Sequence, residues 1–166
     1  MKLTHYSDLG LRLMMYLSLR DGEPVTIGEA SERLDISKNH LVKVSHHLTQ
    51  AGLIESTRGR NGGVRLAFPP EQITVEKVLR ATEDNFDLVE CMSVGENRCI
   101  ITGACKLTAA LEDAREAFFA SLRKVSMADL VRSGRALERS LLPGSIARIQ
   151  GARMPDASKP VRRAAK

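Results

Sequence analysis

The stretch ISKNHLVKVSHHLTQAGLIESTRGRNGGVRLAFPP, residues 36–70, decides the fold of this chain of 166 residues. Its first half predicts a helix, because Ser37 is a favourable amino-terminal cap and Gly52 is a favourable stop. Between them the apolar residues recur at helical spacing, namely at Leu41, Val44 and Leu48. The opposite face of this helix is polar and cationic, and we expect it to be exposed.

The second half of the stretch predicts a β-hairpin. Residues 53–57 and 64–68 favour strands, and the RGRNGG between them favours a tight turn because Asn and Gly accept positive φ angles. The pattern Thr26-x-x-Glu29 is a capping box, which predicts a short helix just before the first one. The order of elements is therefore helix, turn, helix and hairpin.

That order, with a basic hairpin, is typical of a winged helix-turn-helix that binds DNA. Residues 36–68 contain five Lys/Arg, three His and one Glu. A recognition helix places polar and cationic side chains in the major groove, where Asn suits adenine and Lys suits guanine or phosphate. Cationic side chains at a wing tip suit phosphates or the minor groove. A solvated helix and an ordinary hairpin are the alternative. The candidate DNA-binding residues are Lys38, Asn39, His40, Lys43, Arg58 and Arg60.

Further helices are predicted on both sides of this unit. Residues 7–19 favour a helix capped by Ser7, and Thr74 can cap another that begins at Val75. A long amphipathic helix follows, with a narrow apolar seam that suits a partner helix. The residues of this seam are Leu107, Leu111, Ala114, Phe118 and Val125. We therefore expect a mainly α fold with a small β-hairpin wing and a long dimerisation helix.

The chain divides into four expected parts. Residues 1–82 form the winged helix-turn-helix domain, 83–106 a cysteine loop, 107–142 the dimerisation helices, and 143–166 a disordered basic tail. The amino-terminal residues contain no long apolar run, so we expect no membrane span and a cytoplasmic location. We expect no enzyme, because the sequence offers neither a nucleophile–base pair nor a substrate-pocket signature.

All three cysteines lie in CMSVGENRCIITGAC, residues 91–105, with the spacing C-x7-C-x5-C. Three thiols cannot close a set of intrachain disulfides, and clustered thiols in a reducing compartment more often bind metal or carry out redox chemistry. Zinc sites usually use closer C-x2-4-C pairs, whereas iron–sulfur clusters accept longer loops. The spacing therefore favours an iron–sulfur cluster on Cys91, Cys99 and Cys105 over zinc, with one iron left for another ligand.

These segments together resemble the winged-helix iron–sulfur transcriptional repressors, a family with NsrR-like, IscR-like and RirA-like branches. The resemblance covers about residues 1–142. It rests on MKLTHYSDLGLRLMMYL at the amino terminus, on residues 36–70, on the three cysteines, and on ADLV after the long helix. It implies a homodimer in which the long helices cross, with a 4Fe–4S rather than a 2Fe–2S cluster at the interface, near the recognition helix.

The branch determines the fourth ligand and the signal. IscR-like members carry a His three residues after the last cysteine, where this chain has Thr108. NsrR-like members carry an Asp that reaches across the dimer from the start of the first helix, and this chain has Asp8 there. The gap between Cys91 and Cys99 is closer to the RirA-like pattern. From the residues alone, Asp8 is a favourable charge at a helix terminus, and His5 is another possible ligand.

The resemblance thus implies a repressor that binds a palindromic DNA operator and senses nitric oxide, with the operator released on nitrosylation. One alternative is an iron- or redox-responsive regulator of the same fold. An iron–sulfur redox protein is the alternative from another class.

Overall fold

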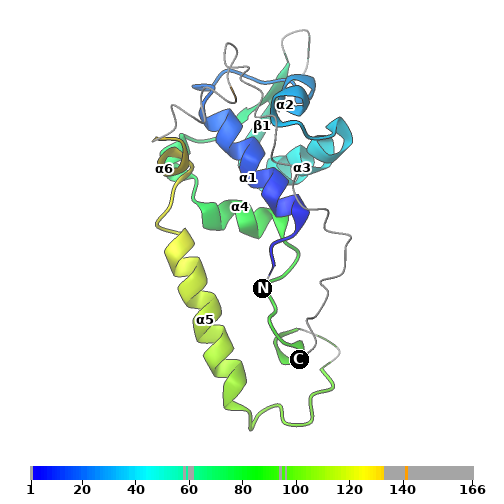
Figure 1. Ribbon diagram of the computed structural model, residues 1–166, viewed down its shortest axis with the longest axis vertical. Coiled ribbons are helices and arrows are strands. Elements are labelled where there is room, and N and C mark those ends of the chain that lie inside the picture. Colours follow the sequence, from blue (N-terminus) through cyan, green and yellow to red (C-terminus); the bar gives the residue numbers. More distant parts are fainter. Residues whose placement is uncertain are drawn as a thin grey trace, which may run out of the picture.

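The computed structural model describes residues 2–57, 59, 62–93, 95, 97–132 and 141. Figure 1 shows the arrangement of its helices and its two strands. In chain order they are α1 (His5–Ser18), α2 (Ile27–Leu34), α3 (Lys38–Gln50), β1 (Ile54–Thr57), β2 (Gly63–Leu66), the 3-10 turn η1 (Pro70–Gln72), α4 (Val75–Thr82), the 3-10 turn η2 (Glu90–Met92), α5 (Lys106–Leu122) and α6 (Met127–Arg132). The fold is mainly α with one antiparallel hairpin, as predicted.

Residues 2–82 and 125–132 pack around one core and are called the body. Helix α1 lies at its centre and contacts α2, α3, α4, α6 and β2. Its apolar side chains Leu13 and Met14 are completely buried. The same core takes in Leu41 from α3, Leu79 from α4 and Met127 from α6, so every helix of the predicted winged domain is anchored on α1.

Three helices of the body begin at the predicted caps. The hydroxyls of Thr26, Ser37 and Thr74 accept hydrogen bonds from the backbone amides three residues later, at 3.1, 3.3 and 3.3 Å. Each bond satisfies one of the amides that a helix start leaves without a partner. The helices predicted from these caps are confirmed.

Helix α1 begins earlier than predicted. Its cap is Thr4, whose hydroxyl accepts from the Ser7 amide at 3.2 Å. Ser7 is inside the helix and completely buried, and its hydroxyl lies 2.8 Å from the hydroxyl of Thr82 on α4. The prediction that Ser7 is the cap is therefore wrong, because its hydroxyl bonds a residue that is distant in the sequence.

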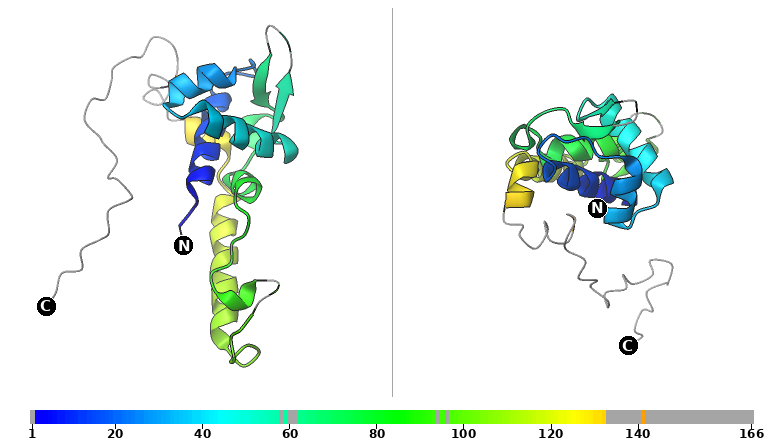
Figure 2. Two further views of the ribbon diagram at one scale, coloured as in Figure 1. Left: turned by 90° about the vertical axis from the view of Figure 1, so that its right-hand side faces the viewer. Right: turned by 90° about the horizontal axis from the view of Figure 1, so that it is seen from above.

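Residues 83–124 leave the body and are called the arm (Figures 1 and 2). The cysteine segment runs out along α5, and α5 leads back to the body. At the base of the arm Phe119, 2% exposed, packs edge-on against Phe86 with ring centroids 4.7 Å apart. The chain rejoins the body where the Val75 amide donates to the Val125 carbonyl at 2.9 Å and the Met127 amide to the Ile73 carbonyl at 2.8 Å.

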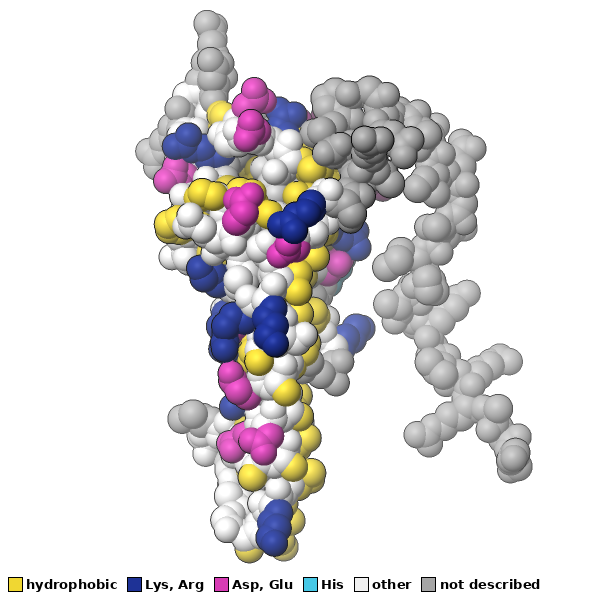
Figure 3. Space-filling view, turned by 90° about the vertical axis from the view of Figure 1, so that its left-hand side faces the viewer, with side chains coloured by type: hydrophobic (Ala, Val, Ile, Leu, Met, Phe, Trp, Pro, Cys, Tyr) yellow, Lys and Arg dark blue, Asp and Glu magenta, His cyan; other side chains and the backbone are white. Residues whose placement is uncertain are grey.

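The long helix is confirmed, but its seam differs in detail. Helix α5 ends at Leu122, so Val125 lies beyond it, and Phe119 is the buried residue where the sequence favoured Phe118. Apolar side chains follow one edge of the arm (Figure 3). Leu107, on the first turn of α5, is 58% exposed. Most of residues 133–166, including the predicted basic tail, lies outside the described residues.

Candidate nucleic-acid interface and cysteine segment

Helix α3 is fixed on the body by one apolar face and presents its other face to solvent. Leu41, Val44 and Leu48 are completely buried beneath it. The helix ends at Gln50, and Gly52 just beyond its cap has a φ of 69°, the left-handed conformation that glycine tolerates best. All four predicted DNA-binding residues of this helix are exposed, namely Lys38, Asn39, His40 and Lys43.

One edge of this face touches the first turn of α1. The His5 ring lies edge-on to His40 with centroids 6.3 Å apart, and the Tyr6 ring lies 5.3 Å from that of His47. Successive residues turn by about 100° around a helix, so Asn39 points away from this edge. His40 is therefore exposed but shared with α1, which the sequence did not indicate.

The wing is joined to the segment before α2. Val25 and Val64 exchange two backbone hydrogen bonds, at 2.9 and 2.8 Å. The segment before α2 therefore pairs with β2 of the hairpin. At Gly63 a Cβ atom would lie only 2.5 Å from the Val25 carbonyl oxygen. Glycine at this position lets the two backbones meet, and this fixes the base of the wing.

The charged residues of the wing are only partly described. Arg65 forms an ion pair with Glu55 at 2.9 Å, directly across the hairpin. Its charge is therefore already matched within the chain. The predicted contacts Arg58 and Arg60 lie outside the described residues.

The first turn of α1 also carries Asp8 and is bonded to the end of α4. The Asp8 carboxylate is 46% exposed and pairs with the Arg12 guanidinium at 2.8 Å. The Thr4 amide and hydroxyl both donate to the Glu83 carboxylate, at 2.7 and 3.0 Å. Glu83 is the first residue of the arm, so this turn connects the cysteine segment to α1.

The cysteine segment is tied to α5 near its start and joins it directly at its end. Cys91 lies 3.1 Å from the hydroxyl of Thr108, and Asp87 pairs with Arg115 at 3.8 Å. Cys105 immediately precedes the first residue of α5. Two of the three thiols are thus placed beside the start of that helix.

The turn around the middle cysteine is organised by polar side chains. The Cys99 amide donates to the Asn97 side-chain oxygen at 3.0 Å, and the Thr102 hydroxyl donates to the Cys99 carbonyl at 2.8 Å. The Arg98 amide donates to the Glu90 carboxylate at 2.7 Å. Hydrogen bonds within the chain therefore define the shape of this turn.

The donor chemistry of the segment fits an iron–sulfur cluster. Cys91, Cys99 and Cys105 are free thiols, each partly exposed, unlike cysteines that serve as buried apolar residues. Among the described residues, no three His, Cys, Asp or Glu side chains converge on a point that could hold a metal ion. The predicted ligands thus share one segment but are not gathered, and Asp8 of the same chain is engaged with Arg12.

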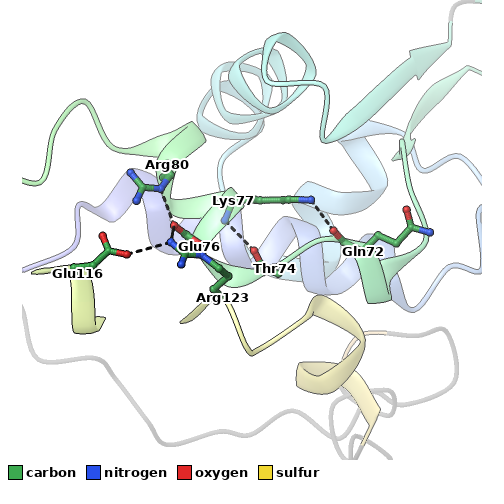
Figure 4. A network of polar contacts seen from close by, with 7 residues as sticks. All are labelled: Gln72, Thr74, Glu76, Lys77, Arg80, Glu116 and Arg123. Atoms are coloured by element: carbon green, nitrogen blue, oxygen red, sulfur yellow. Dashed lines mark hydrogen bonds and ion pairs between the residues drawn. The ribbon is translucent and has the colours of Figure 1, made fainter. Parts of the chain in front are cut away.

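An ionic junction at the base of the arm was not predicted (Figure 4). Glu76, 7% exposed, accepts from the Arg123 guanidinium at 2.6 and 2.9 Å and from Arg80 at 3.0 Å. These bonds, that of Arg123 foremost, hold the pKa of Glu76 at about 2 although burial alone would raise it. The spacing of Glu76 and Arg80 is a visible signal of an ion pair, but Arg123 is 47 positions away from Glu76.

The sequence and the fold both match known regulators. A family model described as Rrf2, iron-dependent transcriptional regulator, matches residues 3–133. The HTH-type transcriptional regulator NsrR of Bacillus subtilis is 44% identical over 134 residues, which cover 80% of this chain and 92% of that protein. NsrR of Geobacillus kaustophilus is 43% identical over 143 residues, covering 86% and 97%.

Solved structures agree on the fold. A transcriptional regulator from Listeria innocua matches with a TM-score of 0.64 at 26% identity, covering 81% of this chain and 88% of that one. T. potens IscR matches with a TM-score of 0.63 at 23% identity, covering 83% and 91%, which shows the fold alone. No described helix is both long and apolar enough to cross a bilayer. With its winged helix-turn-helix and its exposed α3, the chain belongs to the Rrf2 family, as an NsrR-like DNA-binding transcriptional repressor.

Proposed function

We propose that this repressor senses nitric oxide through a 4Fe–4S cluster and loses operator affinity in response. Cys91, Cys99 and Cys105 hold three of the irons, and Asp8 of a second copy of the chain ligates the fourth. When bound, the cluster supplies one iron that is ligated by oxygen. Because a carboxylate oxygen is a weaker ligand of this iron than thiolate, this iron is the reactive position for nitric oxide. The chain's own residues carry the response from there to DNA.

The position of Asp8 is the observation that carries this proposal. Asp8 lies on the first turn of α1, beside His5 and Tyr6, whose rings contact α3. The same turn is hydrogen-bonded through Thr4 to Glu83, where the cysteine segment begins. A change in what Asp8 binds therefore acts on the turn that touches the recognition helix.

Arg12 gives Asp8 a second partner within its own chain. The pair is 2.8 Å long and joins positions i and i+4, but both side chains are nearly half exposed. Such exposed pairs contribute only about 0.3–0.5 kcal/mol. Asp8 can therefore leave Arg12 to reach a metal at small cost, and can return to it when the metal ligation is lost.

On the DNA side, we assign the major-groove contacts to Lys38, Asn39, His40 and Lys43. Their exposure on α3 supports this assignment. Arg58 and Arg60 are assigned to the phosphate backbone or the minor groove from their places in the sequence. Arg65 is a weaker candidate because Glu55 already matches its charge.

The proposed repressor is a homodimer, and its parts follow the boundaries expected from the sequence. Residues 1–82 bind DNA, 83–106 hold the cluster, 107–142 form the dimer, and 143–166 are a basic tail. The apolar edge of the arm (Figure 3) and the 58% exposure of Leu107 on α5 support the dimer. A dimer must meet two half-sites at once, so a small shift of α3 is sufficient to lower operator affinity.

A second candidate is an iron-responsive regulator of the same architecture. The iron-dependent description of the matching family favours it, as does the gap of seven residues between Cys91 and Cys99. The two candidates share the ligands and differ in the signal.

The ligand set is tested by anaerobic purification, absorbance and native mass measurement. Each Cys→Ala variant should lose the iron-dependent absorbance, whereas Asn97→Ala, a change in the same segment, should retain a cluster. A Cys→Ala variant with the full cluster absorbance and mass would remove that cysteine from the ligand set.

The signal is tested by measuring operator affinity during two separate titrations. Nitric oxide should release the operator at a few equivalents per cluster, while an iron chelator applied for the same time should not. Release by the chelator, with affinity unchanged by nitric oxide, would select the iron-responsive alternative.

The role of Asp8 is tested with mixed dimers purified through two different tags. In the first, an Asp8→Ala chain is paired with a chain that lacks the three cysteines. In the second, a wild-type chain is paired with a chain that carries all four changes. Ligation across the dimer predicts the native cluster spectrum in the first pairing and an altered one in the second. The reverse pattern would show that Asp8 acts within its own chain.

A further inference from the structure

We infer that Val42 reads the methyl group of a thymine in each operator half-site. The inference rests on the proposed entry of α3 into the major groove, and it names a specificity-determining residue that the charge pattern of the helix does not reveal.

Val42 is an exposed apolar side chain on an otherwise polar face. It is 48% exposed, whereas the side chains that hold α3 on the body are buried. Residues three and four apart share a helix face, so Val42 neighbours Lys38 and Asn39 on one side and His46 on the other. All three of these neighbours are exposed.

The other exposed large apolar side chains among the described residues lie on other elements. They are Phe68 after β2, Ile100, Ile101 and Leu107 on the arm, and Leu130 on α6. Val42 therefore stands among polar neighbours on its own helix, whereas an apolar protein partner would require a continuous patch. A small apolar target surrounded by polar groups matches it better.

Thymine in the major groove is such a target. It presents a C5-methyl group beside a hydrogen-bond acceptor, and apolar side chains recognise it by contact with that methyl group. A valine in a helix has one strongly preferred χ1 rotamer, so its two methyl groups point in a set direction before binding. Binding the thymine methyl group therefore costs the Val42 side chain little conformational entropy.

The position of Val42 relative to Asn39 also fits base reading. Three residues of helix advance by about 4.5 Å, close to the spacing of about 3.4 Å between base pairs. Asn39, which suits adenine, and Val42 can therefore contact the same or adjacent base pairs. The Val42 carbonyl accepts an additional hydrogen bond from the Ser45 hydroxyl at 2.9 Å, on the turn that follows Val42.

The test uses a duplex selected from random-sequence DNA by the wild-type chain. Each thymine is replaced in turn by deoxyuridine, which removes the methyl group and preserves base pairing, and affinity is measured by fluorescence anisotropy at constant salt. Wild type should bind about fourfold more weakly when one thymine in a half-site is changed, the loss expected for returning one methyl group to water. Changing both half-sites should multiply the two losses.

Val42→Ala is the informative variant, because it removes both γ-methyl groups while raising helix propensity. Val42→Ala should bind with equal affinity the duplex that carries thymine and the duplex that carries deoxyuridine at the sensitive position. Val42→Thr keeps one methyl group in nearly the same shape and should retain part of the discrimination.

Lys43→Ala is the matched control on the same helix. It should weaken binding to both duplexes by the same factor and leave their affinity ratio unchanged. If Lys43→Ala weakens binding but Val42→Ala keeps the wild-type ratio, the inference about Val42 is wrong and the placement of α3 stands. If wild type ignores every deoxyuridine, the inference fails as well. If Lys43→Ala has no effect, the placement of α3 fails, and the inference fails with it.

Discussion

The body and the arm of this molecule are completed in different ways. In the body α1 gathers the apolar side chains of the other helices and of β2 into one core. In the arm the buried residue of α5 is Phe119, at its base, whereas Leu107 and the three thiols remain at least partly exposed. The body thus buries its apolar side chains within one chain, whereas the arm exposes the groups that we propose meet a second copy and a metal cluster.

This difference separates binding from sensing. The helix proposed to meet DNA, α3, is anchored on the body by its buried side chains Leu41, Val44 and Leu48. The segment proposed to sense is tied to α5 by the Cys91–Thr108 hydrogen bond and the Asp87–Arg115 ion pair. A change in the arm can therefore occur without unfolding the core that holds α3, and this suits the proposed separation of sensing from DNA binding.

The comparison is tested most strongly by removing one leucine from each region. Leu13→Ala, in the core of the body, should lower the free energy of unfolding by about 2–5 kcal/mol through lost burial and a residual cavity. Leu107→Ala, on the arm, should change it by less than about 0.5 kcal/mol. Both are measured by denaturant unfolding of cluster-free, monomeric protein. Similar losses would show that the arm is as tightly packed as the body.

Glu76→Gln tests the junction that joins the two regions. Losing charged hydrogen bonds to Arg123 and Arg80 should cost about 2 kcal/mol of stability at neutral pH. The folded-state pKa of Glu76, about 2, lies below its ordinary value of 4.5. Its contribution is therefore full above about pH 4.5 and disappears as the pH falls towards 2.

The measurement is thermal unfolding of both proteins between pH 2.5 and 7. The variant should lose less stability than wild type across the acid range. Glu116→Gln, at the exposed edge of the same junction, is the control and should follow wild type. Parallel curves for Glu76→Gln and wild type would contradict the assigned ionisation.

Lys43→Ala compares the two regions as DNA-binding surfaces. It should weaken operator binding and lower the slope of log affinity against log salt by about 1, as expected for one lost phosphate contact. Arg60→Ala should do the same if the wing contacts the backbone. Lys124→Ala, a lysine of the arm, should leave both quantities unchanged. An equal effect of Lys124→Ala would mean that the arm also contacts DNA.

The smallest expected effect compares two tyrosines of α1. The hydroxyl of Tyr16 donates to Glu29 at 2.9 Å, whereas the buried hydroxyl of Tyr6 has no hydrogen-bond partner among the described residues. Tyr16→Phe should cost about 1 kcal/mol, and Tyr6→Phe should be neutral or slightly stabilising. Both are read from chemical denaturation midpoints. A clear loss in Tyr6→Phe would mean that its hydroxyl meets a group beyond those described.

The sequence predicted features that are set by neighbouring residues. The caps at Thr26, Ser37 and Thr74 and the buried face of α3 depend on local spacing, and all appear in the structure. The Ser7 cap failed because Thr82 takes the Ser7 hydroxyl into the core. Likewise Glu29, expected to complete a capping box, accepts from Tyr16 instead.

The candidate site divides in the same way. The exposure of Lys38, Asn39 and Lys43 follows from helix periodicity. The contact of His40 with His5 depends on how α1 crosses α3, and the junction of Glu76 with Arg123 depends on where the arm returns. Neither contact follows from the spacing of residues along the sequence, so both become visible only in the three-dimensional structure.

The hydrogen bond between Cys91 and Thr108 closes a ring in the arm. It joins positions 17 apart in the chain, and Cys99 and Cys105 lie within that ring. The length-dependent entropy of closing a flexible loop of this size is about 2.5 kcal/mol. Here the loss is incurred when the segment packs on α5, before any metal arrives. The cluster proposed for the three thiols would therefore bind a segment whose loop-closure entropy is already lost.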